Sequence, residues 1–298
     1  MISVVINTLN EEKNLPRVLD SVKNFADEIV VVDMYSDDDT VVLAKKAGAK
    51  VYQHKRMGYV EPARNYAIEK ATGDWILILD ADEEIPKSLT EKLKKLVETP
   101  KSYDYFRVPR KNIIFGKWIK HSNWWPDYNI RFFKKGFVSW NEIIHSVPVT
   151  CGNGADLEVD EKNAIVHHNY STIEQYIDRL NRYSSHQKTA LLKGGYKFTW
   201  KDLIREPMHE FLRRYFQGEG YKDGLHGLSL SLLQAFSELT VYLKVWQEEK
   251  FKDEKATVEN VTVVVKESQR EMNYWVADTL YKIDNSLVQK IKRRFRLS

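Results

Sequence analysis

Two carboxylates separated by one residue follow a continuous apolar run in the first third of the sequence. Residues 75–79 read Trp-Ile-Leu-Ile-Leu, and Asp80 and Asp82 come directly after them. Carboxylate oxygens are the ligands that Mg²⁺ and Mn²⁺ prefer, and such an ion can bridge the oxygens of a diphosphate. The pattern therefore predicts a divalent metal site. The alternative is that both side chains cap a helix that begins near Pro86.

Polar side chains also follow the other predicted strands of this region. Asn10 and Glu11 come shortly after the apolar residues 2–6, and Asp33 ends the next apolar run. Glu11 can accept hydrogen bonds from a ribose or a base and Asp33 is placed similarly, whereas Asn10 is also suited to capping a helix. Arg64 opens a predicted helix, where its guanidinium can meet phosphates or a base; an ordinary surface arginine is the alternative.

Predicted strands and helices alternate through the first hundred residues, and this alternation positions those side chains. Strands are expected at residues 2–6, 28–33, 50–53 and 75–79, and helices at 15–25, 40–47 and 60–71. Apolar runs without alternation are typical of strands covered on both faces, as in a parallel sheet flanked by helices. The sequence therefore predicts an α/β, Rossmann-like, mostly parallel sheet, whose ligands bind beyond the carboxyl ends of the strands.

The rest of the chain changes character twice. Short strand-like pieces are expected at residues 103–109, 113–115, 130–133 and 146–149, and helices from Ser171 onward, including one near Pro207 and one near Leu225. A charged linker, a Val-rich strand at 261–265, a closing helix and a basic tail complete the sequence. We therefore expect a catalytic domain over residues 1–170, a helical region over 171–250 and a strand–helix extension over 251–298.

Bulk properties exclude several classes of protein. The net charge of +4 and pI of about 8.8 are too weakly basic to indicate a nucleic-acid partner. The single cysteine, Cys151, excludes an intrachain disulfide and a multi-cysteine zinc site. Neither a signal-peptide pattern nor an apolar run of about 18 residues is found, so we expect a cytoplasmic protein, with peripheral contact to the inner face of the plasma membrane left open.

Taken together, the ordered motifs resemble those of family 2 glycosyltransferases. The motifs that carry the resemblance are Thr8-Leu9-Asn10-Glu11-Glu12, Asp33 through Ser36-Asp37-Asp38 to Thr40, Ala63-Arg64-Asn65 and Leu79-Asp80-Ala81-Asp82-Glu83. Later segments are similar to the branch that builds lipopolysaccharide cores and other surface glycans: Trp125-Pro126-Asp127, Arg131-Phe132-Phe133, Ile144-His145, Asn181-Arg182-Tyr183-Ser184, Gly218, Gly220, Asp223-Gly224 and Gly227. The resemblance covers roughly residues 1–250.

The resemblance implies a GT-A fold with a helical C-terminal extension and an inverting transfer of sugar from a nucleotide-sugar donor, expected to be UDP-linked, to a glycan or lipid-linked acceptor. In that scheme Thr8, Asn10, Glu11 and Asp33 hold the nucleoside and Arg64 assists. Asp80 touches the ribose or the metal, and Asp82 is the principal ligand of Mg²⁺ or Mn²⁺.

The general base that deprotonates the acceptor stays open between Asp127, Glu142 and His145, because many relatives have an acidic residue after the histidine where this chain has Ser146. Tyr35 also departs from the family, which usually has glycine there. A second histidine pair, His167-His168, is a further candidate for a metal ligand or a diphosphate contact.

Two other readings compete with a glycosyltransferase. A nucleotidyltransferase shares the sheet and the acidic cluster, but it needs a glycine-rich basic loop after the first strand, where this chain is acidic. A non-catalytic nucleotide-sugar-binding protein at an anionic membrane surface is suggested by the basic tail and by an apolar stripe along residues 225–246. Burial of that stripe against the rest of the protein is equally compatible with its pattern.

Overall fold

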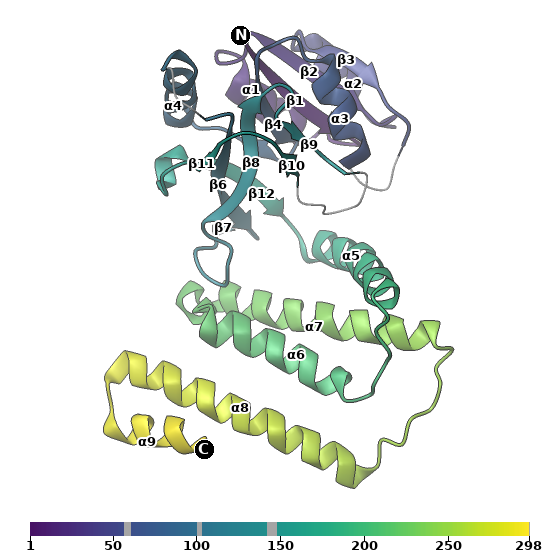
Figure 1. The fold of residues 1–298 in the computed structure, drawn as a ribbon, viewed down its shortest axis with the longest axis vertical. Helices are drawn as coiled ribbons and strands as arrows, with labels where there is room; N and C mark the ends of the chain where they lie inside the picture. The colour runs from purple at the N-terminus through teal and green to yellow at the C-terminus, as the bar shows by residue number, and fades with distance from the viewer. Residues whose placement is uncertain (57–60, 100–102, 142–147, 298) are drawn as a thin grey trace. The chain divides into compact units, whose positions relative to one another are not determined.

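The computed structural model describes residues 1–56, 61–99, 103–141 and 148–297 of the chain (Figure 1). These residues form two compact units. The first comprises Met1–Ile114 and Trp125–Asn169, and the second comprises Phe115–Trp124 and Tyr170–Ser298. Each unit is described by itself.

A mixed sheet forms the centre of the first unit. Its strands are β1 (Ile2–Thr8), β2 (Glu28–Asp33), β3 (Lys50–Gln53), β4 (Trp75–Asp80), β5 (Glu83–Glu84), β6 (Tyr105–Ile114), β8 (Asp127–Lys134) and β12 (Ile165–Tyr170). Their order is β3-β2-β1-β4-β8-β6-β12-β5. Strands β1 to β4 pair in parallel, and β8 runs antiparallel to β4 and to β6. Opposition of Thr8 to Asp33 and of Asn7 to Asp80 brings three carboxyl ends to one edge.

Helices cover both faces of the parallel strands. They are α1 (Leu15–Val22), α2 (Thr40–Lys46), α3 (Glu61–Lys70) and α4 (Lys87–Glu98). Leu77 and Leu79 of β4 pack in a core that includes the apolar faces of α1 and α4, whereas Ile76 and Ile78 pack in a core that includes α3. Burial on both faces explains the apolar runs without alternation and confirms the predicted architecture.

Shorter elements complete the first unit. β9 (Val138–Ser139) pairs antiparallel with β10 (Val149–Thr150), and β11 (Gly154–Asp156) pairs in parallel with β6. A 3₁₀ turn at Glu161–Asn163 precedes β12. The predicted strand at 146–149 falls partly outside the described residues.

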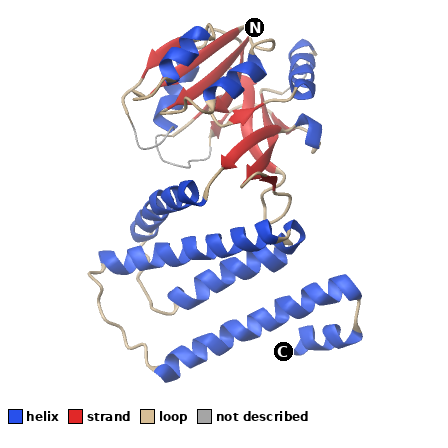
Figure 2. Cartoon of the chain, turned by 180° about the vertical axis from the view of Figure 1, so that it is seen from behind, coloured by secondary structure: helices blue, strands red, loops and turns tan. Residues whose placement is uncertain are grey.

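Most of the second unit is helical (Figure 2). Its helices are α5 (Ile173–Lys193), α6 (Asp202–Leu212), α7 (Leu225–Glu248), α8 (Val258–Asp284) and α9 (Leu287–Phe295). A π-helical turn at Arg213–Gln217 extends α6, and a 3₁₀ turn at Gly220–Asp223 precedes α7. Helix α7 packs on α5 and α6, and α8 packs on α6 and α9. In the described part of the chain no helix is both long and apolar enough to cross a bilayer.

Two local predictions for this unit are wrong. The helix expected near Pro207 begins at Asp202, because hydrogen bonds from Asp202 to Thr199 and from Leu203 to Trp200 start it upstream, and Pro207 is accommodated inside. The strand expected at 261–265 is the start of α8 instead. The Thr257 side chain caps that helix by accepting from the Asn260 N–H, and the buried Val264 packs inward, so context overrides the strand preference of valine.

The segment Phe115–Trp124, which contains the short strand β7 (Lys117–Trp118), is held against the turn before α7. The buried Asp223 carboxylate accepts hydrogen bonds from the backbone N–H groups of Lys120 and His121, at 3.2 and 2.9 Å. A Cβ atom at Gly227 would lie 1.8 Å from the Gly220 carbonyl oxygen. The late glycines and Asp223 therefore form a socket for this segment within the second unit.

Candidate active site

A buried ion cluster occupies the carboxyl end of β4. The Asp80 carboxylate accepts a hydrogen bond from Arg64 Nη2 of α3 at 2.7 Å and another from Arg131 Nη2 of β8 at 2.6 Å. Burial raises the pKa of the Asp80 carboxyl, but Arg131 and Arg64 outweigh it and hold the pKa well below its usual range. Asp80 is therefore ionised at any physiological pH, and each of its oxygens already has an arginine partner.

Glu83, which is fully buried, extends this cluster to the neighbouring strands. It accepts from Arg131 Nη2 at 2.7 Å and from Arg110 Nη1 of β6 at 3.1 Å, and its other oxygen accepts from the Asp80 N–H at 2.9 Å. The sequence analysis quoted Glu83 and Arg131 in motifs but gave them no role, and it missed Arg110. The signal that could have found them is the pairing of β6 with β8, which lies outside the motif around Asp80.

Asp127, a predicted candidate for the base, begins β8. Its Oδ2 lies 2.8 Å from Arg110 Nε and 2.6 Å from Arg110 Nη2, and it accepts from Asn112 Nδ2 at 3.1 Å. Burial raises the pKa of this carboxyl, but the cation of Arg110 and the hydrogen bond from Asn112 outweigh it, so the pKa is lowered. Asp127 is thus ionised, as a base must be, and one of its oxygens is committed to Arg110.

Asp82 and His167 face each other beside this cluster. Asp82 Oδ2 lies 3.5 Å from His167 Nε2, and both side chains are almost completely buried. The backbone carbonyl of Asp82 accepts from the His168 N–H at 2.9 Å, while the His168 ring bonds Glu84 instead. The structure thus brings together the second predicted metal ligand and the first histidine of the pair.

Asn112 determines which nitrogen of His167 carries the proton. Asn112 Nδ2 lies against the Asp127 carboxylate, which only accepts, so the amide oxygen faces His167 Nδ1 at 2.7 Å. A neutral His167 must then donate from Nδ1, which leaves the lone pair of Nε2 directed at Asp82. A hydrogen bond to the far ring nitrogen is the usual support of a histidine metal ligand.

Asp82 and His167 fit one divalent ion. Two ligands held about 2.1 Å from one ion lie roughly 3.0–3.4 Å apart, close to the observed 3.5 Å. Within the described ranges no group of three or more His, Cys, Asp or Glu residues could hold a metal ion. Two protein ligands suit Mg²⁺ or Mn²⁺, which usually take the remaining positions from substrate phosphates and water.

The predicted nucleoside ligands join two loops at the ends of β1 and β2. Thr8 Oγ1 donates to Asp33 Oδ1 at 3.0 Å, and the Ser36 N–H donates to Asp33 Oδ2 at 2.9 Å, within a fully buried Asp33 side chain. The Asn10 N–H donates to Ser36 Oγ at 2.8 Å, and the Glu11 N–H donates to Thr40 Oγ1 at 2.8 Å. These residues therefore build one rigid loop pair at the sheet edge.

Two positions next to these loops bear on the remaining predictions. Tyr35, where relatives usually have glycine, adopts the positive φ of 60° and is half-exposed. Arg64 lies with its guanidinium carbon 5.4 Å from the centre of the Trp140 ring, and Asn65 bonds both backbone polar groups of Trp140. The predicted base candidates Glu142 and His145 lie outside the described residues.

Sequence comparisons agree with this geometry. Residues 3–153 match the model of "Glycosyl transferase family 2", and the chain belongs to that family and has its GT-A fold. It is 34% identical over 244 residues to an uncharacterized glycosyltransferase of Rickettsia typhi, covering 79% of this chain and 83% of that protein. It is 28% identical over 257 residues to the lipopolysaccharide core biosynthesis glycosyltransferase LpsC of Rhizobium meliloti, covering 83% and 92%. The resemblance to the surface-glycan branch is thus confirmed.

Similarity to solved structures is weaker. The TarS fragment 1–349 of S. aureus in complex with UDP covers 82% of this chain and 91% of its own at 16% identity and a TM-score of 0.45. The glucosyl-3-phosphoglycerate synthase of Mycobacterium tuberculosis in complex with Mn²⁺, UDP and phosphoglyceric acid covers 38% and 43% at 27% identity and a TM-score of 0.33.

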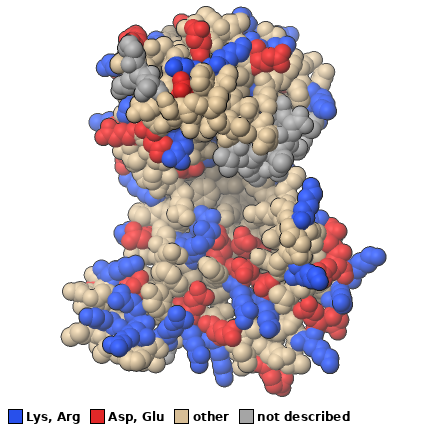
Figure 3. Space-filling view, viewed as in Figure 1, with Lys and Arg blue, Asp and Glu red and all other residues tan. Residues whose placement is uncertain are grey.

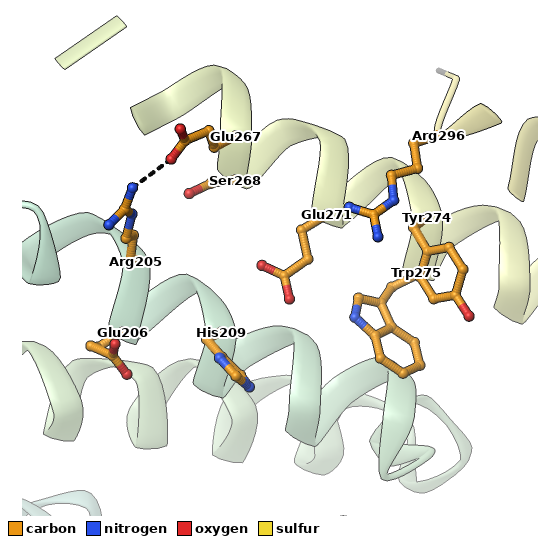
Figure 4. Close-up of a pocket in the computed structure, with 9 residues that line it drawn as sticks. All are labelled: Arg205, Glu206, His209, Glu267, Ser268, Glu271, Tyr274, Trp275 and Arg296. Atoms are coloured by element: carbon orange, nitrogen blue, oxygen red, sulfur yellow. Dashed lines mark hydrogen bonds and ion pairs between the residues drawn. The ribbon is translucent and has the colours of Figure 1, made fainter. Parts of the chain in front are cut away.

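A separate cavity of about 640 Å³ lies in the second unit, between α6 and α8 (Figure 4). Its walls carry Glu206 and His209 of α6 and Glu271 and Trp275 of α8, and an ion pair of 2.6 Å between Arg205 and Glu267 crosses it. None of the site residues predicted from the sequence lines this cavity, so it is distinct from the cluster around Asp80.

Proposed function

We propose that this chain is an inverting, metal-dependent glycosyltransferase that moves a sugar from a UDP-linked donor to a glycan or lipid-linked acceptor in the synthesis of a cell-surface polysaccharide or lipopolysaccharide. The observation that carries the proposal is the pairing of Asp82 with the Nε2 side of His167, beside an Asp80 that two arginines neutralise. The relationship to LpsC, whose name specifies lipopolysaccharide core biosynthesis, supports the class of acceptor.

The charges of the site favour a divalent cation together with a diphosphate. Four carboxylates, those of Asp80, Asp82, Glu83 and Asp127, face the guanidiniums of Arg64, Arg110 and Arg131. One carboxylate, that of Asp82, is left to the metal. A bound Mg²⁺ or Mn²⁺ supplies charge that stabilises the leaving nucleoside diphosphate.

The protein's own groups divide the remaining work. Asp82 and His167 would hold the ion, and Asp80 holds Arg64 and Arg131 at the edge where a diphosphate is expected. The loop pair built by Thr8, Asn10, Glu11 and Asp33 would meet the nucleoside. The acceptor proton goes to a base chosen from Asp127, Glu142 and His145.

A nucleotide-release assay tests the proposal. The wild-type protein should release nucleoside diphosphate from a UDP-sugar with Mn²⁺ or Mg²⁺ and lose this activity with a chelator. Asp82→Asn should lower the rate by about 10²-fold or more, as expected when charge stabilisation in the transition state is removed. Asp156→Asn, in an exposed ion pair with Arg107, is the matched control and should leave the rate unchanged. Full activity of Asp82→Asn in chelator would refute the metal assignment, and release of pyrophosphate would indicate a nucleotidyltransferase.

A second assay distinguishes the three base candidates. Asp127→Asn, Glu142→Gln and His145→Gln should be compared for donor affinity and for the rate of transfer. Replacement of the base should lower transfer by about 10²-fold or more while donor affinity stays constant. If all three variants keep at least a tenth of the wild-type rate, the base is another residue.

A further inference from the structure

Helix α9 turns an apolar face to the solvent. Leu287, Val288, Ile291 and Phe295 are each more than half exposed, at 73%, 59%, 54% and 63%. At 100° per residue, these four side chains fall within one 100° sector of the helix. We call this sector the α9 face. A surface helix of a globular protein normally turns such a sector inward, so its exposure needs an explanation.

Contacts on the opposite side hold α9 in this orientation. Arg293 Nη1 lies 2.9 Å from the buried Asp278 of α8, and its guanidinium lies 4.8 Å from the centre of the Tyr281 ring. Just after the helix, the Arg296 guanidinium lies 5.7 Å from the centre of the Tyr274 ring. The polar side of α9 is therefore attached to α8, and the α9 face is presented outward by design of the contacts rather than by loss of a partner helix.

Basic side chains border the α9 face. Lys292 flanks it on one side and Arg294 and Lys290 flank it on the other, and residues 287–298 contain no Asp or Glu. Figure 3 shows Lys and Arg gathered where Figure 1 places α9, with other side chains between them. In the described residues neither Lys290, Lys292 nor Arg294 has an acidic partner within 4 Å. An apolar sector with a basic border is complementary to an anionic lipid surface.

Two other occupants of the α9 face are less compatible with its charge. A second copy of the chain would bring two identical basic borders together, which repel each other. A position across the bilayer is too long for α9, because nine residues extend about 14 Å against roughly 30 Å of hydrocarbon. Helix α7 also exposes Leu225, Leu232 and Phe236, but its charged residues Glu238, Lys244 and Glu248 do not form a basic border, so nothing there selects a lipid surface.

We propose that α9 is a membrane-docking helix, which lies in the plane of an anionic bilayer with the α9 face among the headgroups and first acyl carbons. It names the surface at which the proposed function would meet a lipid-linked acceptor. The inner face of a plasma membrane has the required negative charge.

Co-sedimentation of the full chain with vesicles tests this inference without any sugar transfer. The protein should bind vesicles of phosphatidylcholine mixed with phosphatidylglycerol, bind pure phosphatidylcholine at least tenfold less, and dissociate as salt rises. Ile291→Ser/Phe295→Ser and, separately, Lys290→Glu/Arg294→Glu should each lower the partition coefficient by about tenfold or more. None of these four residues belongs to the candidate active site, so nucleotide release from a donor alone should be unchanged.

Matched controls come from α2, in the first unit. Val42→Ser changes a side chain that is 61% exposed, and Lys45→Glu/Lys46→Glu reverses two exposed charges. Both should bind as wild type. Equal binding to neutral and anionic vesicles, or equal losses in the α9 variants and the controls, would overturn the inference. A concentration-dependent dimer that Ile291→Ser/Phe295→Ser abolishes, without vesicle binding, would assign the α9 face to a second copy.

Discussion

The two edges of the parallel sheet use buried carboxylates in different ways. At the amino ends of the strands, Glu28 is a single buried acid with one cation, Lys50 Nζ at 2.7 Å, and two neutral donors, Ser3 Oγ at 2.5 Å and the Thr72 N–H at 2.7 Å. These contacts join the starts of β1, β2 and β3 to the turn before β4. One carboxylate is sufficient to hold that edge together.

At the carboxyl ends, ionised groups are crowded instead. Asp80, Glu83 and Asp127 share three arginines within a region that is mostly buried, with Asp82 and His167 alongside. Burying charged groups costs several kcal/mol per ion before pairing offsets it, and well-packed apolar side chains would serve stability at least as well. The difference teaches that the amino edge is built for folding, whereas the carboxyl edge maintains a charge arrangement that folding alone does not require.

Removal of Arg131 should have the largest effect on stability. Arg131→Met leaves the buried Asp80 and Glu83 without their shared cation, so the free energy of unfolding should fall by about 3–5 kcal/mol. Urea denaturation measures this loss. Arg107→Met, which breaks an exposed pair with Asp156, should cost less than about 1 kcal/mol. Equal, small losses in both variants would mean that the carboxyl edge is no more dependent on its charges than the surface.

Replacement of Glu28 should have the next largest effect, and its effect should depend on pH. Burial raises the pKa of this carboxyl, but the hydrogen bonds from Lys50, Ser3 and Thr72 outweigh it and lower the pKa from 4.5 to about 2. A lowered pKa stabilises the fold fully above the unfolded value of 4.5, and the contribution is lost as pH falls from 4.5 to about 2.

Glu28→Gln should therefore lower the free energy of unfolding at neutral pH by about 2–3 kcal/mol, and the difference from wild type should shrink through that acid window. Sugar transfer should be unaffected, because Glu28 lies at the edge away from Asp80. Glu98→Gln, an exposed acid on α4, is the control and should unfold as wild type at every pH. A constant difference from pH 6 to pH 2 would show that the loss is not electrostatic.

The sequence predicted the carboxyl edge well where it depends on local pattern. The strands expected at residues 2–6, 28–33, 50–53 and 75–79 correspond to β1, β2, β3 and β4, because continuous apolar runs suit strands buried on both faces. That assignment alone placed Asp80 and Asp82 beyond a strand end.

The partners of those carboxylates could not be predicted in the same way. Arg110 and Arg131 reach the cluster from β6 and β8, whose pairing shifts register between Phe106 and Arg107. A one-residue shift moves every following side chain to the other face of the sheet, and local sequence does not reveal it. Helix α8 failed for a related reason, because the strand preference of its valines was outweighed by capping at Thr257 and by packing of Val264.

The smallest expected effect concerns Asn112, and it separates a metal-binding histidine from a structural one. Asn112 Oδ1 holds the Nδ1 side of His167 at 2.7 Å, and it does not face the proposed ion itself. If His167 is a ligand, Asn112→Ala should weaken binding of Mn²⁺ by about 10–100-fold, because such supporting hydrogen bonds orient the ring and fix its tautomer. Calorimetric titration of Mn²⁺ in the presence of UDP measures this affinity directly. It avoids turnover, which Asn112 can also affect through its contact with Asp127 at 3.1 Å. Asn163→Ala, which removes a comparable amide-to-carboxylate contact with Asp160, should bind Mn²⁺ as wild type. Unchanged affinity in Asn112→Ala, with the fold intact by circular dichroism, would leave Asp82 as the ligand and remove His167 from the metal site.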